Sequence, residues 1–191
     1  MRQLAIALVH YPILARDQST ITTAITNLDI HDIARSAFTY NVNRYYIVHP
    51  VAAQRELAQR VKEHWTNGSG ARRIPDRKPP MEALRVVESL QAAQTDFEGC
   101  ETWVTSAQPF VDSVDHGQAA EFLQEDGPPV LLVLGTGWGL APEVTEAAAL
   151  RLAPIESARS DGYNHLSVRA AAAIFLDRLV LPRRRAEIAP G

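Results

Sequence analysis

The stretch VLLVLGTGWGLAPE, residues 130–143, decides the fold, because a pure strand sequence runs directly into a glycine loop. Residues 130–134 are an unbroken apolar run, which is typical of an inner strand of a parallel sheet covered on both faces. Gly135, Gly137 and Gly139 then alternate, and glycine permits positive φ and close backbone approach. We expect this loop at the carboxyl end of a strand, where open α/β sheets bind ligands.

The glycine loop taken alone leaves two interpretations open, a ligand-binding loop and a plain tight turn between a strand and a helix. It is not a dinucleotide fingerprint, since the third glycine of G-x-G-x-x-G would fall at Leu140, and no Gly-Lys-Ser/Thr follows to make a P-loop. A second polar loop, PIESARSDGYNHLSV at residues 154–168, leads into an alanine-rich helix predicted over residues 166–181. Two loops at the ends of buried elements indicate a site.

Predicted strands and helices alternate along the chain. Strands are expected over residues 4–9, 44–48, 85–88, 102–105 and 130–134, and helices over residues 27–40, 51–65, 89–95, 118–124, 142–150 and 166–181. Asn27 or Asp29 is the expected cap of the first helix, and Leu57 and Val61 the expected inner side of the second. Residues 17–27 show no clear period, and residues 67–80 are expected to be a mobile loop. The alternation predicts an α/β fold, a mostly parallel sheet with helices on both faces.

The composition is that of an ordinary globular protein. Of 191 residues, 46% are hydrophobic and 21% charged, and no apolar run approaches the ~20 residues of a membrane span. Residues 1–12 are too short an apolar start for a signal peptide and predict a core strand. The single cysteine, Cys100, excludes an internal disulfide and fits a reducing cytoplasm. We expect one domain over residues 1–182 and a basic, disordered tail over residues 183–191.

A net charge of −3 excludes a globally basic nucleic-acid binder, so any RNA contact must be local. Two basic clusters are candidates for this RNA contact: the tail residues 183–185, and a loop cluster of Arg72, Arg73, Arg77 and Lys78. For each cluster the alternative interpretation is an ordinary solvated surface. The histidines show no metal-ligand spacing, and no metal site is expected. Asp29, His31 and Asp32 are the only tight group of acids and imidazole, which we interpret as a solvated helix start.

Three predicted strand ends converge on one place: residues 105–107, 135–140 and 155–167. They offer backbone donors and acceptors, few charges and aliphatic walls, which suits an adenosine-like ligand. Trp138 either stacks on a ligand or RNA base or simply packs. The candidate cofactor-binding residues are Thr105, Ser106, Ala107, Leu134, Gly135, Thr136, Gly137, Trp138, Gly139, Leu140, Ile155, Asn164, His165, Leu166 and Ser167.

The helix predicted over residues 166–181 has almost no polar face before Asp177 and Arg178, so it should be buried nearly all round. One side can pack on the sheet. Its four consecutive alanines, residues 170–173, permit close approach of another helix on the other side. The sequence leaves two candidates for this second helix: a helix of a second copy of the chain, or another helix of the same chain.

The runs LLVLGTGWGL and YNHLSVRAAAAI resemble the second and third signature motifs of the SPOUT, or α/β-knot, class of S-adenosylmethionine-dependent RNA methyltransferases. The run ITNLDIHDIARSAFTYNVNRYYIV resembles the first motif of the SpoU-type branch. An arginine at the position of Arg35 is implicated there in ribose 2′-O-methylation. The resemblance therefore implies that Arg35 is catalytic, orienting the RNA hydroxyl and stabilising developing oxyanion charge. The residues alone leave a helix-surface arginine as the alternative.

Over nearly its whole length the chain is similar to a bacterial family of SPOUT domains labelled as a C-terminal tRNA (guanine-N1) methyltransferase domain. The resemblance implies a SPOUT fold with a deep C-terminal trefoil knot, S-adenosylmethionine held in the knot, and a homodimer. It also implies an RNA substrate, tRNA or rRNA, whose phosphates the loop cluster would contact.

The second motif departs from the SpoU pattern. Thr136 and Gly137 stand where asparagine and glutamate usually follow the first glycine, and the loop is one residue shorter. Two hypotheses therefore remain. The first is an RNA methyltransferase acting on tRNA or rRNA, with ribose 2′-O-methylation as one form of the reaction. The second is a catalytically inactive SPOUT-fold module that binds RNA or a protein partner.

Overall fold

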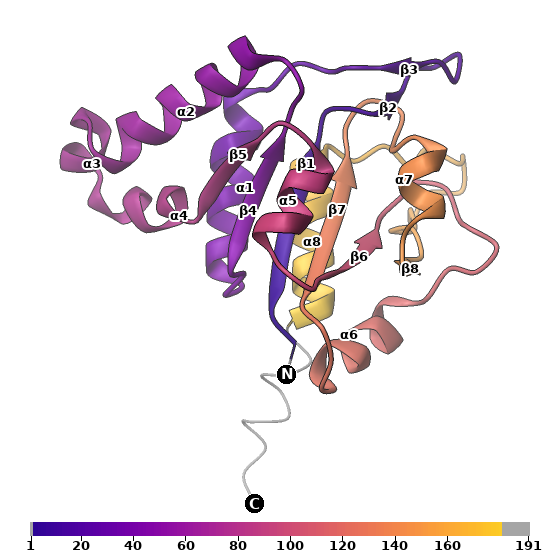
Figure 1. Ribbon diagram of the computed structural model, residues 1–191. Helices are drawn as coiled ribbons and strands as arrows, with labels where there is room; N and C mark the ends of the chain where they lie inside the picture. The colour runs from indigo at the N-terminus through magenta and orange to yellow at the C-terminus, as the bar shows by residue number, and fades with distance from the viewer. Residues whose placement is uncertain (1, 181–191) are drawn as a thin grey trace, which may run out of the picture.

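The computed structural model describes residues 2–180 and has a parallel sheet at its centre (Figure 1). Within these residues the sheet has six strands in the order β5-β4-β1-β7-β6-β8, and each neighbouring pair is parallel. The strands are β1 (Leu4–Val9), β4 (Arg44–Val48), β5 (Leu84–Val87), β6 (Glu101–Val104), β7 (Val130–Gly135) and β8 (Leu150–Arg151). The predicted α/β fold with a mostly parallel sheet is confirmed.

Helices cover both faces of this sheet. The larger layer packs on one face and consists of α1 (Asn27–Thr39), α2 (Ala52–Thr66), α4 (Lys78–Glu82), α6 (His116–Gln124) and α8 (Val168–Val180). The other face carries α5 (Leu90–Asp96) and α7 (Pro142–Glu146). In β1, Ile6 and Leu8 point to the first layer, and Ala7 and Val9 to the second. A strand covered on both faces must be apolar throughout, as β1 and β7 are.

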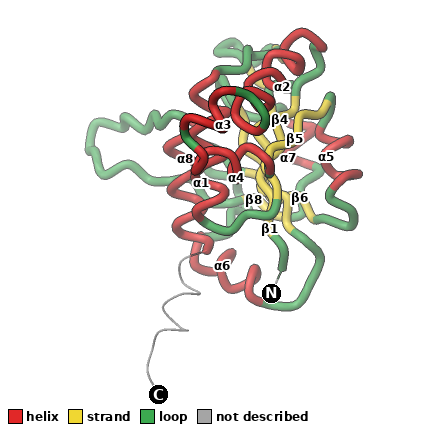
Figure 2. The backbone as a smooth tube through the Cα atoms, turned by 90° about the vertical axis from the view of Figure 1, so that its left-hand side faces the viewer, coloured by secondary structure: helices red, strands yellow, loops and turns green. Residues whose placement is uncertain are grey.

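Helices α1 and α8 lie side by side and run in the same direction (Figures 1 and 2). Near their starts Arg169 Nη1 donates to Asp29 Oδ1 at 2.8 Å, and near their ends the Tyr40 hydroxyl donates to Asp177 Oδ1 at 3.0 Å. The prediction that the last helix is buried nearly all round is wrong for the single chain. Only one side of α8 packs on the sheet. The buried residues of the helix lie on that side and are Ala172, Phe175, Leu176 and Leu179.

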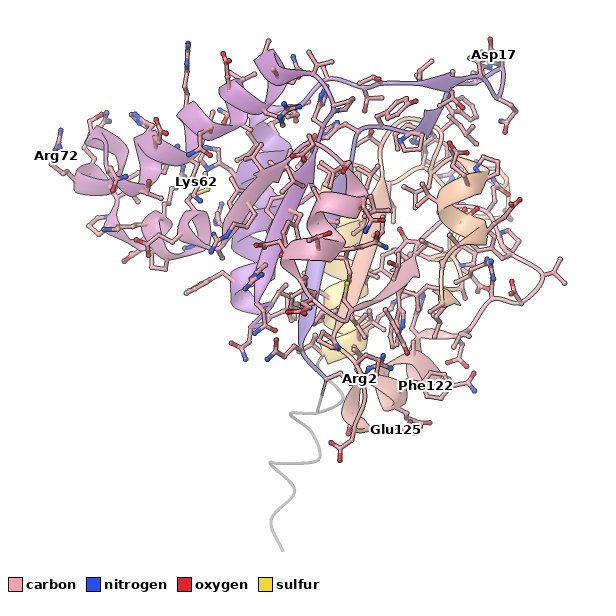
Figure 3. All side chains as sticks on the ribbon, in the orientation of Figure 1. Arg2, Asp17, Lys62, Arg72, Phe122 and Glu125 are labelled. Atoms are coloured by element: carbon pink, nitrogen blue, oxygen red, sulfur yellow. The ribbon has the colours of Figure 1, made fainter. Side chains whose placement is uncertain are left out.

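A short hairpin follows β1 and was not predicted. Its strands, β2 (Ile13–Leu14) and β3 (Thr20–Ile21), pair antiparallel, and Gln18 has a φ of 67° at the turn. Asp17 lies at the projecting tip of this hairpin (Figure 3). Two-residue strands are too short to show the alternation by which strands are predicted.

The predicted mobile loop over residues 67–80 is also wrong. The segment folds into α3 (Ser69–Arg73), a 3₁₀ turn η1 (Pro75–Arg77) and α4. Met81 of α4 is buried in the core, and the Arg77 guanidinium lies 4.8 Å from the centre of the Trp65 ring. Helices this short, interrupted by proline and glycine, have no amphipathic period to detect.

Smaller differences have local causes. Thr26 caps α1 in place of Asn27 or Asp29, because its hydroxyl accepts a hydrogen bond from Asp29 N at 3.2 Å. Leu57 is 47% exposed on α2, where the buried position is Ala58. The helix predicted over residues 142–150 ends four residues early, and its last predicted residue begins β8.

Among residues 2–180, no helix is long and apolar enough to cross a membrane. The predicted basic tail, residues 183–191, lies outside the described part of the chain.

Candidate functional site

The carboxyl ends of β1, β6 and β7 meet at one edge of the sheet. From β1 the chain moves through β4 to β5 on one side, and its remaining strands lie on the other side. Open α/β sheets bind ligands where the strand order reverses in this way. A cavity of about 230 Å³ lies at this edge, next to the ends of β6 and β7.

The cavity is lined by the ends of β6 and β7, the glycine loop, the loop before α8 and the first turns of α8. Among its described lining residues, His165 is the only one with an ionisable side chain. Its walls are the apolar residues Leu134, Ile155, Leu166, Val168, Ala171 and Phe175. Apolar walls with main-chain polar groups at their rim suit a ligand with apolar faces and polar edges, such as an adenine ring.

The glycine loop folds back tightly over the end of β7. Gly137 and Gly139 have φ values of 58° and 111°, which side-chain-bearing residues rarely adopt. A Cβ on Gly135 would lie 2.8 Å from Leu140 N, and one on Gly137 would lie 3.0 Å from Ile13 Cγ2. Packing of the loop against itself and against the hairpin therefore requires Gly135 and Gly137, whereas Gly139 is required by its positive φ.

Main-chain hydrogen bonds join the hairpin to the glycine loop. Leu14 N donates to Gly139 O at 2.9 Å, and Trp138 N donates to Leu14 O at 3.1 Å. A third bond runs from Ala141 N to Pro12 O at 3.2 Å. The hairpin thus sets the shape of one wall of the cavity, while the Trp138 side chain stays 59% exposed at its rim.

A buried polar network lies below the same loop. The hydroxyls of Thr136 and Thr23 share a short hydrogen bond, and Thr23 Oγ1 lies 3.1 Å from His10 Nδ1. His49 Nδ1 accepts from Val51 N, so its Nε2 carries the proton and donates to Thr23 O at 3.0 Å. The loop is therefore tied through its second residue to the ends of β1 and β4.

His10 is the most buried titratable group of this network. Burial, and then the nearby His49, lower the pKa of the His10 imidazole to about 4. Its Nε2 is buried and has no hydrogen-bond partner among the residues that the structure describes. The imidazole is therefore neutral near pH 7, which suits a role in packing and orientation.

The structure brings most of the predicted cofactor-binding residues to the cavity. Those that line it are Thr105, Ser106, Ala107, Leu134, Gly135, Gly137, Trp138, Gly139, Ile155, Asn164, His165 and Leu166. Asn164 also fixes its loop, because its side-chain amide donates to Ile155 O at 2.8 Å.

Three predicted residues do not line the cavity, and each has another role. Thr136 joins the buried network, and Leu140 is 6% exposed in the core beside Ile13. Ser167 Oγ accepts from Ala170 N at 3.2 Å at the start of α8. The lining residues not predicted are Gln108, Val168, Ala171 and Phe175. The last three lie on the inner side of α8 and recur at the helical spacing i, i+3 and i+7 that begins at Val168.

Arg35 does not line the cavity. Its side chain is 60% exposed on the third turn of α1, and its Nη1 lies 4.0 Å from Asp32 Oδ1. The predicted RNA-contact residues lie on α3, η1 and the start of α4, with Arg72 far from the hairpin tip (Figure 3). Burial and the charges of Arg77 and Arg35 lower the pKa of His31, so both arginines act on one imidazole.

The interpretation of Asp29, His31 and Asp32 as a solvated helix start is wrong for Asp29. Its side chain is 7% exposed and pairs with Arg169 on α8. The partner lies 140 residues away along the chain, so no local pattern identified it. Within the described residues no group of three or more His, Cys, Asp or Glu side chains could hold a metal ion.

The chain is similar to bacterial proteins, among them one from Nitratidesulfovibrio vulgaris and one from Aquifex aeolicus. The tRNA (guanine-N(1)-)-methyltransferase of Nitratidesulfovibrio vulgaris is 44% identical over 184 residues, which span 94% of this chain but only 42% of that protein. An uncharacterised protein of Aquifex aeolicus is 37% identical over 179 residues, covering 91% of this chain and 86% of its own length. The chain thus spans less than half of the named methyltransferase and most of the second relative.

A solved structure has the same fold. The TrmH/SpoU tRNA modifying enzyme of A. aeolicus superposes with a TM-score of 0.57 over 98% of this chain and 78% of that one, at 15% sequence identity. The sequence model for the family described as SAM-dependent RNA methyltransferase matches residues 3–181. This match and the Aquifex relative span almost the whole of the sequence, and the chain therefore belongs to the family of SAM-dependent RNA methyltransferases, which use S-adenosylmethionine as cofactor.

Proposed function

We propose that this chain binds S-adenosylmethionine in the cavity at the carboxyl ends of β6 and β7, and that it transfers the methyl group of this cofactor to tRNA. The observation that carries the proposal is the cavity itself, with apolar walls, the main chain of the glycine loop and no carboxylate among its described lining residues. This lining fits an adenosine group. In the proposed complex Thr105, Ala107 and the glycine loop hold the base and ribose, and S-adenosylmethionine supplies an activated methyl group.

The acceptor atom that we propose is a ribose 2′-oxygen. Methylation releases a proton from either acceptor, and the described lining residues include no carboxylate, so His165 is their only ionisable side chain that can take it. What favours the hydroxyl is an arginine on α1, since a fixed cation can stabilise negative charge that develops on the oxygen. The guanine-N(1) name belongs to a relative of which this chain spans 42%, so the remainder of that protein can supply what this chain lacks. Guanine N1 is the second candidate, and rRNA the second candidate substrate.

Arg35 is the residue that we propose to act at the RNA hydroxyl. A fixed guanidinium can orient the hydroxyl and stabilise the negative charge that develops on its oxygen. Because Arg35 lies outside the cavity of its own chain, the acceptor nucleotide or a second copy must bring the two together. A homodimer is the arrangement that we favour.

The surface that we propose for the second copy is the outer side of α8. Ala170 and Ile174 are one turn apart on that side, and neither is among the buried residues of the helix. Small and branched side chains there permit close helix packing. Ile174→Lys should convert a dimer to a monomer in sedimentation, whereas Leu57→Lys, at an exposed leucine of α2, should not. A wild-type monomer at assay concentrations would exclude this arrangement.

The remaining parts of the proposal concern the chain as a whole. A C-terminal trefoil knot, in which the loop before α8 is threaded, would explain why residues 155–166 reach the ends of β6 and β7. We treat residues 1–182 as one domain, and Arg72, Arg73, Arg77 and Lys78 as its phosphate contacts. A cytoplasmic location follows from a tRNA substrate.

The experiment is methyl transfer from radiolabelled S-adenosylmethionine to a pool of tRNA transcripts made in vitro, followed by mass spectrometry of the nucleosides. We expect a 2′-O-methylated nucleoside, and 1-methylguanosine would favour the second acceptor. Arg35→Gln should lower kcat by about 10²–10³ while leaving S-adenosylhomocysteine affinity within about twofold. Arg60→Gln, at an exposed arginine of α2, is the matched control.

A wild-type chain that binds the cofactor but methylates neither tRNA nor rRNA would contradict the proposal. It would favour an inactive module that binds RNA or a protein partner.

A further inference from the structure

Asp29 is a buried carboxylate at the start of α1. Its Oδ2 accepts from the Thr26 hydroxyl at 2.7 Å, and its Oδ1 accepts from Arg169 Nη1 at 2.8 Å. The side chain is only 7% exposed, and a charge at this depth is costly unless it is paired and hydrogen-bonded. Arg169 is the cation that pairs with it.

Arg169 has a second acidic contact. Its Nε lies 3.5 Å from Asp32 Oδ2, while the other oxygen of Asp32 lies 4.0 Å from Arg35 Nη1. Two arginines from different helices therefore share one carboxylate. Arg169 makes the closer approach to Asp32 and also holds Asp29.

The position of Arg169 on α8 links these contacts to the cavity. Val168, its neighbour in sequence, and Ala171, in the same turn, both line the cavity. Arg169 pairs with Asp29 on α1, which lies beside α8 (Figure 2). One turn of α8 therefore contacts both the cavity and the helix that carries Arg35. The distance between these two parts of the site depends on the Arg169 contacts.

We propose that Arg169 is a positioning residue for methyl transfer. It fixes the first turn of α8 against the first turn of α1, and it keeps Asp32 from neutralising Arg35. The proposal rests on the function proposed above, since it needs Arg35 to act on the RNA. A misplacement of about 1 Å in an active site can lower the rate about a hundredfold, so this contact is sufficient to control the rate.

The test compares Arg169→Gln, Arg169→Lys and the double variant Arg169→Gln/Asp32→Asn. We expect Arg169→Gln to lower kcat on the tRNA transcripts by at least about tenfold at saturating cofactor, because Asp32 then pairs with Arg35. The double variant, which also lacks the Asp32 charge, should have a kcat several-fold higher than that of Arg169→Gln. Arg169→Lys keeps the charge without the two-pronged geometry and should be intermediate.

A second readout does not depend on activity. Calorimetric titration with S-adenosylhomocysteine should show a dissociation constant raised by about threefold or less in Arg169→Gln. Thermal unfolding should show that Arg169→Gln and Asp29→Asn are not additive, since each removes the same ion pair. Asp32→Asn alone should keep a wild-type melting temperature.

A purely structural role gives a different pattern. Arg169→Gln would then lower the melting temperature but keep the wild-type kcat at temperatures where it is folded, and Asp32→Asn would restore nothing. Either result overturns the proposal while leaving the proposed function intact. Wild-type protein that binds S-adenosylhomocysteine but methylates neither tRNA nor rRNA would overturn both together.

Discussion

At the scale of single residues, His10 shows how the polar groups under the glycine loop are held. It lies directly after β1, fully buried, with Nδ1 at the Thr23 hydroxyl and Nε2 without a partner among the described residues. Burial lowers the pKa of its imidazole to about 4, so the folded chain binds this proton more weakly than the unfolded chain does. This difference couples folding to pH.

The first prediction is a loss of stability in mild acid that depends on His10. The unfolded imidazole gains its proton near pH 6.5, whereas the folded one does so near pH 4, so its contribution is complete above pH 6.5 and is lost as the pH falls to 4. Urea unfolding should show the stability gap between wild type and His10→Gln shrinking by about 2–3 kcal/mol between pH 7.5 and 4.5. A gap that is constant across this range would show that His10 keeps an ordinary pKa.

At the scale of elements, the hairpin and the glycine loop form one unit. Gly137 has a φ of 58° and leaves 3.0 Å between a hypothetical Cβ and Ile13 Cγ2. Gly99 has a similar φ of 72° with nothing within 4 Å of such a Cβ. The two glycines separate the cost of backbone strain from the cost of contact with the hairpin.

The second prediction compares Gly137→Ala with Gly99→Ala. Both should lose about 1 kcal/mol from the positive φ, and Gly137→Ala should lose at least about 1 kcal/mol more because the methyl group meets the hairpin. Only Gly137→Ala should weaken S-adenosylhomocysteine binding, because only that loop lines the cavity. Denaturant unfolding and calorimetry measure the two effects, and equal losses in both variants would show that the hairpin is not packed against the loop.

The third prediction concerns α3. Arg72 and Arg73 end this short helix, and contacts between them and RNA phosphates would release bound counterions. Arg72→Gln/Arg73→Gln should lower the slope of log affinity for tRNA against log salt concentration by about 1.5. Arg44→Gln, at the amino end of β4 where the guanidinium is already paired with Asp96, should leave the slope unchanged. An unchanged slope in the double variant would remove α3 from the RNA interface.

The sequence predicted those elements whose pattern is local. β1, β4 and β7 are apolar runs bounded by polar residues, and their predicted ranges agree with the structure to within one residue. The hairpin and α3 could not be predicted in this way, because neither has a period of its own. The hairpin is held by hydrogen bonds to the glycine loop, and α3 packs through Gly70 against His64 and Trp65. The same distinction applies in the site, where loop residues were found and the inner side of α8 was missed.

At the scale of the whole molecule, the order of the strands places the site. The glycine loop, the end of β6 and the loop before α8 come from three separate parts of the chain, and the reversal of strand order beside β1 brings them to one edge. The glycine loop together with the polar loop before α8 predicted a site, while the pairing of Asp29 with Arg169 across 140 residues required the folded structure. The chain's central property is therefore a cavity formed by its topology, which we propose holds the cofactor.

The most direct test of this account is calorimetric titration of S-adenosylhomocysteine into the wild type, Ala107→Trp and Ala158→Trp. Ala107 lines the cavity and is exposed, so a tryptophan there should block it without disturbing the core. Ala158 is exposed in the loop before α8 and does not line it. We predict binding to the wild type and to Ala158→Trp, and affinity lowered at least about tenfold in Ala107→Trp. Absence of binding to the wild type, or equal affinity in all three proteins, would contradict the assignment of this cavity as the methyl-donor site.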